Sequence, residues 1–234
     1  MTLVTLDVVF VLPRRLRQLA VTCSNQLADA MEAHGGACFR LGSDFPGQSD
    51  GPCEPHVSIF MMAVEDHEVP AVGAALAEAA RTCEPVTATA TEYRHNHEGA
   101  PEVFFDRTDE FRDVQRAVVA AVEPLRRGRL RERGPGGEPL AAILDDPNPD
   151  DPARVRQLRR YGFDDVSDDE DDRFNPHVTL TWPRDETTRT DLFVLPSVGE
   201  FSGELGELAL YGMSPNGTCT TKHGAWTLTR SRVR

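Results

Sequence analysis

Helix-spaced apolar positions alternate along the chain with segments that look like strands. Residues 3–12 are rich in β-forming residues and stop at Pro13, which can open a helix because its missing N–H costs nothing at the first helical position. In the next segment apolar residues recur every three or four positions until a Gly-Gly pair, which predicts one helix with a single buried face. The same spacing predicts helices over about 68–83, from Asp109 to about 125, and over 152–161.

Short apolar or alternating runs between these helices predict strands. They are residues 37–41, 55–62, 86–93, 101–107 and 174–183, with 139–144 as a further short candidate and a C-terminal pair at 203–213 and 224–233 joined by the turn signal SPNGT. Helices placed among hairpins favour an α+β fold with antiparallel sheets. The Gly-, Pro- and Asp-rich stretch 128–151 is the best candidate for a connection between two lobes. We therefore predict one catalytic domain made of two pseudo-repeated halves, 1–127 and 128–234.

Composition narrows the classes of protein to consider. No run of about 18 apolar residues occurs, so no segment is predicted to span a membrane. The N-terminus lacks the basic start and small-residue cleavage site of a signal peptide, so a cytoplasmic location is expected. The five cysteines form no C-x-x-C pair, which favours free, buried or half-buried thiols over a metal site or a disulfide framework.

The net charge of −13 disfavours long duplex nucleic acid as a partner, because such binding depends mainly on neutralising phosphates with Lys and Arg. Much of the acid lies at 145–151 and 164–172, which we interpret as solvated loops, and the arginine run 125–133 as a solvated helix end and linker. A small phosphorylated ligand held by a local site remains compatible with this charge. We expect a monomer that uses no cofactor.

Two strand-like segments carry almost the same unusual pattern, PHVSIF at 55–60 and PHVTLTW at 176–182. They lie about half a chain apart, which favours duplication of a functional element over two unrelated core histidines. Alternation on a strand predicts that each histidine shares a face with the hydroxyl two residues later, roughly 7 Å away. The members of these two faces are His56, Ser58 and Phe60 in the first strand, and His177, Thr179 and Thr181 in the second.

Two imidazoles facing one cleft can act as a general acid and a general base, because an unperturbed histidine pKa near 6.5 allows one to be neutral while the other is protonated. Adjacent hydroxyls can donate hydrogen bonds to phosphate oxygens. This constellation suits attack of water on a phosphodiester without a metal ion. Phe60, Thr181 and Tyr93 are further candidates for substrate contacts.

The segments HVSI and HVTL resemble the paired H-x-[ST]-hydrophobic signatures of the two-histidine (2H) phosphoesterase superfamily, which includes bacterial RNA 2′,3′-cyclic phosphodiesterases once called 2′-5′ RNA ligases. The stretch leading into PHVTL and the closing ELALYGM…AWTL pair are also similar to that superfamily. The resemblance implies a bilobal α+β fold with two antiparallel sheets facing a central cleft. It also implies His56 and His177 as the acid–base pair, in either order, and Ser58 and Thr179 as phosphate-binding residues.

The activity implied is metal-independent hydrolysis of a cyclic phosphodiester, in a small cyclic nucleotide or at an RNA 3′ end. The chain is more acidic than the RNA-processing members usually are around their cleft, which favours a small cyclic substrate. Two alternatives stay open. One is a biosynthetic or metabolic enzyme that uses the same cleft on another small substrate, and the other is a non-catalytic module that binds nucleotides or RNA ends.

Overall fold

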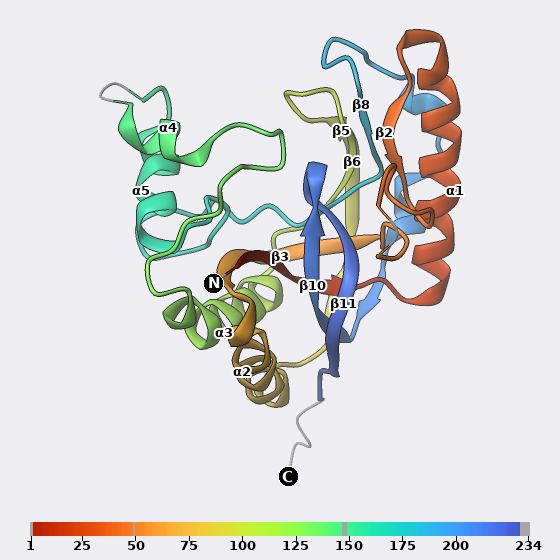
Figure 1. The fold of residues 1–234 in the computed structure, drawn as a ribbon. Coiled ribbons are helices and arrows are strands. Elements are labelled where there is room, and N and C mark those ends of the chain that lie inside the picture. The colour runs from red at the N-terminus through yellow and green to blue at the C-terminus, as the bar shows by residue number, and fades with distance from the viewer. Residues whose placement is uncertain (1, 49, 147–148, 230–234) are drawn as a thin grey trace.

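The computed structural model describes residues 2–48, 50–146 and 149–229 (Figure 1). Its strands are β1 (Leu3–Val11), β2 (Ala37–Arg40), β3 (His56–Glu65), β4 (Val86–Ala88), β5 (Ala90–His95), β6 (Pro101–Phe105), β7 (His177–Thr179), β8 (Thr181–Pro183), β9 (Gly203–Leu205), β10 (Glu207–Ser214) and β11 (Thr218–Thr227). Its α-helices are α1 (Arg14–Met31), α2 (Val69–Thr82), α3 (Asp109–Arg126), α4 (Leu140–Asp145) and α5 (Pro152–Tyr161). The predicted α+β class is confirmed.

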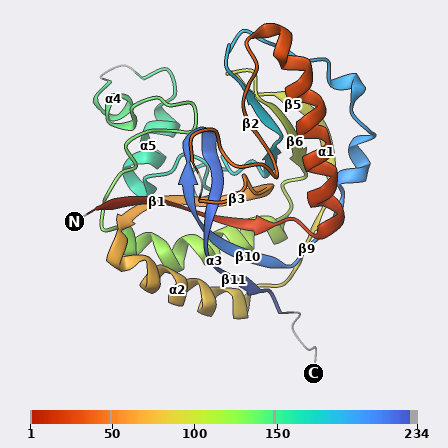
Figure 2. The same cartoon turned by 45° about the vertical axis from the view of Figure 1, so that its right-hand side comes forward.

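Two antiparallel sheets form the centre of the molecule. One has the strand order β11-β10-β1-β3 and the other has the order β5-β6-β7, while β2 pairs with β8 and β4 with β9. Helices α2 and α3 lie side by side beneath the four-stranded sheet, and α1 lies against β2 and β8 at the other side of the molecule (Figure 2). Among the described helices, none is both long and apolar enough to cross a membrane.

Each of the two sheets contains strands from both halves of the chain. The four-stranded sheet combines β1 and β3 with β10 and β11, and the three-stranded sheet combines β5 and β6 with β7. The sequence halves 1–127 and 128–234 therefore do not correspond to the two sheets. In each sheet, two strands from the first half are completed by strands from the second half.

The helix ends follow their predicted chemistry closely. Helix α1 presents a buried face of Leu16, Ala20, Cys23 and Leu27 and is followed by a left-handed glycine, Gly35, at φ +94°. Thr108, one residue before the predicted start of the helix, accepts a hydrogen bond from the Phe111 amide at the start of α3.

Helix α5 begins at Pro152, where Asp151 accepts from the Arg154 amide. It ends at Tyr161, and the following Gly162 has a φ of +68°.

A β-bulge changes which residues of β3 face the cleft. Along β1 and β3 the register shifts between Val8 and Val9, so that Val9 pairs with Ser58 while Asp7 pairs with Met61. Paired residues share a face of the sheet, and Asp7 and Val9 share one by alternation. Met61 therefore takes the face of Ser58, and Phe60 takes the opposite one.

Two further expectations from the sequence are wrong. Residues 140–145 form the short helix α4 instead of a strand. The arginine run is only partly solvated: Arg127 is exposed, but Arg126 and Arg131 are buried at 4% and 2% exposure and Arg129 bonds Glu65 and Glu68.

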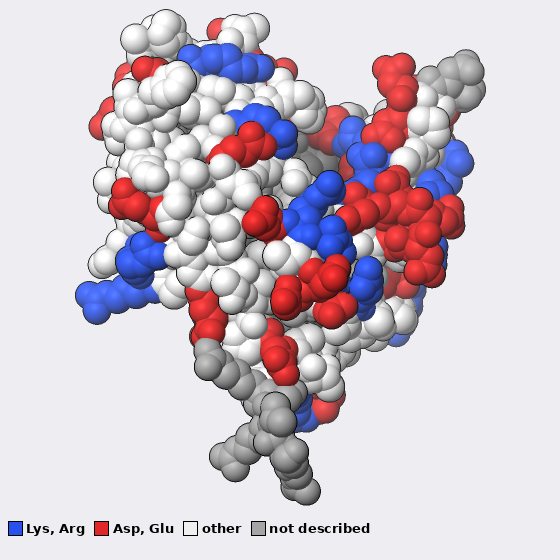
Figure 3. Space-filling model, turned by 180° about the vertical axis from the view of Figure 1, so that it is seen from behind, with Lys and Arg blue, Asp and Glu red and all other residues white. Residues whose placement is uncertain are grey.

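The acidic segment at 164–172 is also tied into the protein. Arg156 of α5 bonds Asp168, and Arg112 of α3 bonds Asp172. On the side of the molecule where α5 lies, acidic side chains gather with arginines among them (Figure 3). Much of this negative charge is thus neutralised locally.

Candidate active site

His56 begins β3 and is held by the chain just before it. Its Nδ1 lies 2.7 Å from the Glu54 carbonyl oxygen, and a carbonyl accepts hydrogen bonds, so Nδ1 carries a proton. In the neutral ring this leaves Nε2 as the acceptor nitrogen. The side chain is 13% exposed, so part of it reaches solvent.

Asp7 of β1 completes a first half-site with His56 and Ser58. The Ser58 hydroxyl donates to Asp7 Oδ2 at 2.7 Å, and the same oxygen lies 3.8 Å from His56 Nε2. Asp7 has no exposed surface, and burial raises its pKa to about 7 against the opposing effects of the Ser58 hydroxyl and the Arg131 charge. This carboxyl therefore titrates near neutral pH.

Glu102, His177 and Thr179 form a second half-site with the same arrangement. His177 Nδ1 lies 2.7 Å from the Asn175 carbonyl, and its Nε2 lies 3.8 Å from Glu102 Oε1. The Thr179 hydroxyl donates to that same Oε1 at 3.2 Å. Glu102 stands on β6, directly opposite Thr179 on β7, just as Asp7 stands on the strand next to Ser58.

The two half-sites lie close enough to influence each other. Strands β3 and β7 are in contact, and the charge of His177 affects the pKa of His56. Burial lowers the pKa of His56 below its ordinary value, with the positive charge of His177 acting in the same direction. The neutral form of His56 is therefore favoured.

The pKa of His177 moves in the other direction. Burial works against the charged ring, but the carboxylate of Glu102 and the Asn175 carbonyl outweigh it, and the pKa of His177 rises above its ordinary value. Asp165 contributes to this rise, and its own pKa is raised to about 7 by burial. The site thus favours one neutral and one protonated imidazole.

The predicted residues His56, Ser58, His177 and Thr179 are brought together as paired half-sites. Sequence reasoning missed the carboxyl groups, Asp7, Glu102 and Asp165. Asp7 left a signal, because it is the single charged residue in the apolar run LVTLDVVFVL and an acid in such a strand needs a partner. Glu102 and Asp165 left none, since they lie in segments where acids are common.

The three predicted substrate contacts do not reach the cleft. Phe60 is fully buried against Phe163, because the bulge in β3 turns it to the face opposite Ser58. Thr181 is fully buried and donates to the Phe39 carbonyl at 2.6 Å. Tyr93 pairs with Val103, on the face of β5 and β6 away from His177, and packs on Phe201.

The cleft face of β5 and β6 offers a different set of contacts. Phe104 pairs with His177 across the strands, and their ring centroids are 5.5 Å apart. The Arg94 guanidinium lies 4.2 Å from the centroid of Phe104. Both side chains line a hollow of about 620 Å³, together with Thr91, Glu92, Phe105, Asp106, Arg107, Asp171, Asp172, Arg173 and Asn175.

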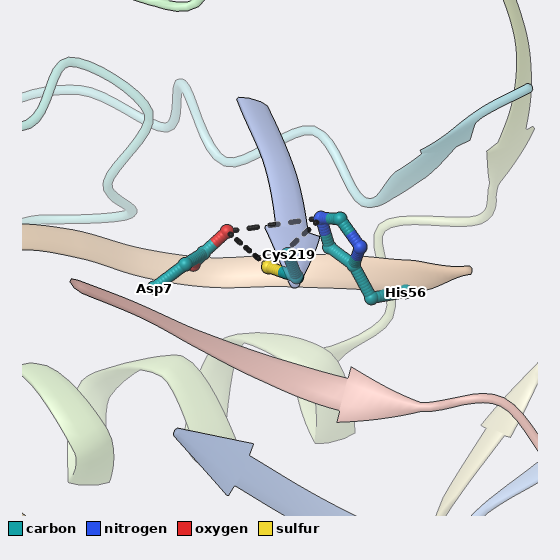
Figure 4. Close-up of side chains that lie close together, drawn as sticks. All are labelled: Asp7, His56 and Cys219. Carbon is teal, nitrogen blue, oxygen red and sulfur yellow. Dashed lines mark hydrogen bonds and ion pairs between the residues drawn. The ribbon is translucent and has the colours of Figure 1, made fainter. Parts of the chain in front are cut away.

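Cys219 of β11 lies beside the first half-site (Figure 4). Its Sγ is 3.7 Å from His56 Nε2 and 3.8 Å from Asp7 Oδ2. As expected from the sequence, all five cysteines are free, four of them buried and one half-buried. The second half-site has Asn96, which donates to Glu102 at 3.0 Å, as a further polar partner.

No protein-family model matches the sequence, and no curated protein is significantly similar to it. Solved structures are similar over almost the whole chain. Escherichia coli LigT, solved with 3′-AMP, is 14% identical with a TM-score of 0.51, covering 97% of this chain and 99% of its own. A phosphoesterase is 13% identical with a TM-score of 0.53, covering 98% and 100%.

A third structure, TT0787 of Thermus thermophilus, is 18% identical with a TM-score of 0.51 and covers 97% of this chain and 100% of its own. The chain therefore has the fold of the two-histidine phosphoesterases, as the paired motifs predicted. At these identities the likeness establishes the fold alone.

Proposed function

We propose that the chain is a metal-independent phosphodiesterase that hydrolyses a cyclic phosphodiester of a small nucleotide by two-histidine acid–base catalysis. The observation that carries this proposal is the repeated half-site: in each, a histidine, a hydroxyl and a buried carboxyl have the same connections. One cleft then holds two imidazoles whose pKa values move apart, which is the arrangement that paired acid and base catalysis needs.

The pKa directions support one assignment of the roles that the motifs alone left open. Neutral His56 accepts a proton at Nε2 from the attacking water, whose oxygen forms the new bond to phosphorus. Protonated His177 donates its Nε2 proton to the ester oxygen that leaves as the ring opens. His56 then releases its added proton to solvent and His177 takes up a proton from solvent, which restores the resting enzyme.

Asp7 provides a way for Ser58 to bind the phosphate. In the structure the Ser58 hydroxyl donates to Asp7. Because the pKa of Asp7 is raised to about 7, a protonated Asp7 can instead donate to Ser58 and free the hydroxyl proton for a phosphate oxygen. In the second half-site Thr179 is the corresponding hydroxyl; it donates to Glu102 in the structure and would turn this proton to a phosphate oxygen when substrate binds.

The hollow beside His177 supports a nucleotide substrate. Phe104 and Arg94 share the sheet face of His177 and offer an aromatic ring and a cation next to the phosphate position. The similar LigT has been solved with 3′-AMP, and also with phosphate. We infer that the nucleoside part of the substrate lies in this hollow while its cyclic phosphate lies between the histidines.

Hydrolysis of 2′,3′-cyclic mononucleotides in EDTA tests this function, with cyclic dinucleotides and cyclic-phosphate-ended RNA as comparison substrates. We expect His56→Ala and His177→Ala each to lower kcat by about 10²- to 10⁴-fold, the usual contribution of a general acid or base. His34→Ala, at an exposed histidine after α1, is the matched control and should keep wild-type activity. Full activity in either cleft variant would refute the proposal, and tight binding without turnover would select a binding module.

A further inference from the structure

We propose that Asp7, His56 and Cys219 form a binding site for Zn²⁺, and that the ion acts as an inhibitor by occupying His56. The three residues come from β1, β3 and β11, and their side chains converge at one point (Figure 4). Asp7 Oδ2, His56 Nε2 and Cys219 Sγ form a nearly equilateral triangle, with separations of 3.8, 3.7 and 3.8 Å.

This triangle fits one face of a zinc tetrahedron. With Zn–S near 2.3 Å and Zn–N and Zn–O near 2.0–2.1 Å, ligand atoms lie roughly 3.3–3.6 Å apart. The three atoms therefore need to approach one another by only a few tenths of an ångström. A water molecule would take the fourth position.

The burial and hydrogen bonding of the three residues fit a metal ion. Asp7 and Cys219 have no exposed surface, and among the described residues no group donates to Asp7 Oδ1. His56 donates Nδ1–H to the Glu54 carbonyl, and this is the outer hydrogen bond that typically orients a metal-binding histidine with Nε2 free. A bound ion would compensate a carboxylate and a thiolate that are otherwise costly to bury.

The ligand types select the kind of metal. A thiolate, an imidazole and one carboxylate suit Zn²⁺ and exclude Mg²⁺ and Ca²⁺, which prefer oxygen ligands alone. Binding requires Cys219 to lose its thiol proton, and Asp7 to lose its proton when it carries one, and these protons pass to the buffer. The second half-site has no thiol near His177 and Glu102, so it offers no equivalent site in the described chain.

The inhibition, unlike the metal binding itself, depends on the proposed function. In that mechanism His56 Nε2 must accept a proton from water. A zinc ion bound to Nε2 removes this base, so micromolar Zn²⁺ should inhibit and EDTA should restore activity. Mg²⁺ should have no effect.

Binding can be measured without any substrate by titrating the full chain with CoCl₂ and ZnSO₄. A thiolate ligand gives Co²⁺ an intense charge-transfer absorption, and Zn²⁺ should abolish it at one equivalent. Cys219→Ser should remove the absorption, whereas Cys83→Ser, at another buried cysteine near the end of α2, should retain it. Asp7→Asn is a second variant and should weaken Zn²⁺ binding at least tenfold in a chelator competition.

The outcomes separate the two proposals. No cobalt–thiolate absorption, or an absorption unchanged in Cys219→Ser, overturns the metal site. Metal binding together with a lack of hydrolysis of every cyclic phosphate overturns the proposed function and leaves the metal site standing. Activation by Zn²⁺ would overturn the inhibitory role.

Discussion

The first half-site (Asp7, His56, Ser58) and the second (Glu102, His177, Thr179) share their connections but differ in charge. Each histidine is fixed through Nδ1 by the carbonyl two residues before it, and each hydroxyl donates to a carboxyl on the neighbouring strand. The pKa of His56 is nevertheless lowered while that of His177 is raised. A duplicated arrangement can thus supply both an acid and a base when only its surroundings diverge.

The divergence lies in the carboxyl groups around each imidazole. Burial dominates at His56, and the carboxyl beside it has a pKa of about 7, so that it is partly neutral near pH 7. His177 faces Glu102 and is also influenced by Asp165. The sequence motif thus specifies the histidine and the hydroxyl, whereas residues on the neighbouring segments determine whether the histidine is protonated.

Neutralising the carboxyl of the second half-site should have the largest effect on this asymmetry. Wild-type kcat/KM should follow a bell with pH, limited at low pH by protonation of His56 and at high pH by deprotonation of His177. Glu102→Gln removes a charge that favours protonated His177, so the alkaline limb should move to lower pH, at a cost of about tenfold in activity on that limb per pKa unit. Asp7→Asn assayed near pH 6, where Asp7 is already largely protonated, should change activity much less.

NMR titration of the two imidazoles checks the same prediction directly. The His177 resonance should titrate at lower pH in Glu102→Gln, and the His56 resonance should move less. An unchanged His177 titration in that variant would show that Glu102 does not hold the proton on His177.

Removing each hydroxyl should have an intermediate effect. Ser58→Ala and Thr179→Val each delete one donor to the phosphate, which costs about 1 kcal/mol or several-fold in kcat/KM. Thr181→Val is the matched control, because that hydroxyl bonds the Phe39 carbonyl inside the protein. This variant should lower the free energy of unfolding and leave kcat/KM as in the wild type. A kcat/KM loss equal to that of Thr179→Val would show that Thr181 contacts the substrate.

Phe60 should give the smallest effect on catalysis. Phe60→Leu keeps a large apolar side chain in the core and should lower the free energy of unfolding by about 1 kcal/mol. Because Phe60 packs on Phe163 away from Ser58, KM for a cyclic nucleotide should not change. Thermal unfolding and steady-state kinetics on the same preparation check both parts, and a raised KM would place Phe60 in contact with substrate.

The pattern of the sequence predicted the α+β class, most helices and strands, and the two histidine–hydroxyl pairs. Asp7 stood out as the charged residue of an apolar strand, but which carboxyl lies beside which histidine could not be predicted, because the pairing of β1 with β3 and of β6 with β7 is not visible in local periodicity. The predicted face of Phe60 was wrong for a related reason. One extra residue in a bulge reverses the faces of the residues after it, and no turn residue or proline in the sequence indicates the bulge.

The arginine run shows that a local run of charges does not predict burial. A series of charges is usually solvated, yet Arg131 lies buried with its Nη1 3.5 Å from Met61 Sδ and influences the pKa of Asp7. Its burial depends on the path of residues 128–140 across the molecule. That path is a property of the whole fold.

The mixing of strands from both halves in each sheet also has a consequence for how the protein folds. The central strand β1 needs β10 on one edge, and Cys219 reaches His56 from β11, so the first half-site joins the two ends of the chain. Such pairings close very long loops, which slows folding and postpones it until late in synthesis. Neither half expressed alone would form a complete sheet, and the two fragments should recover a folded molecule only by assembling with each other.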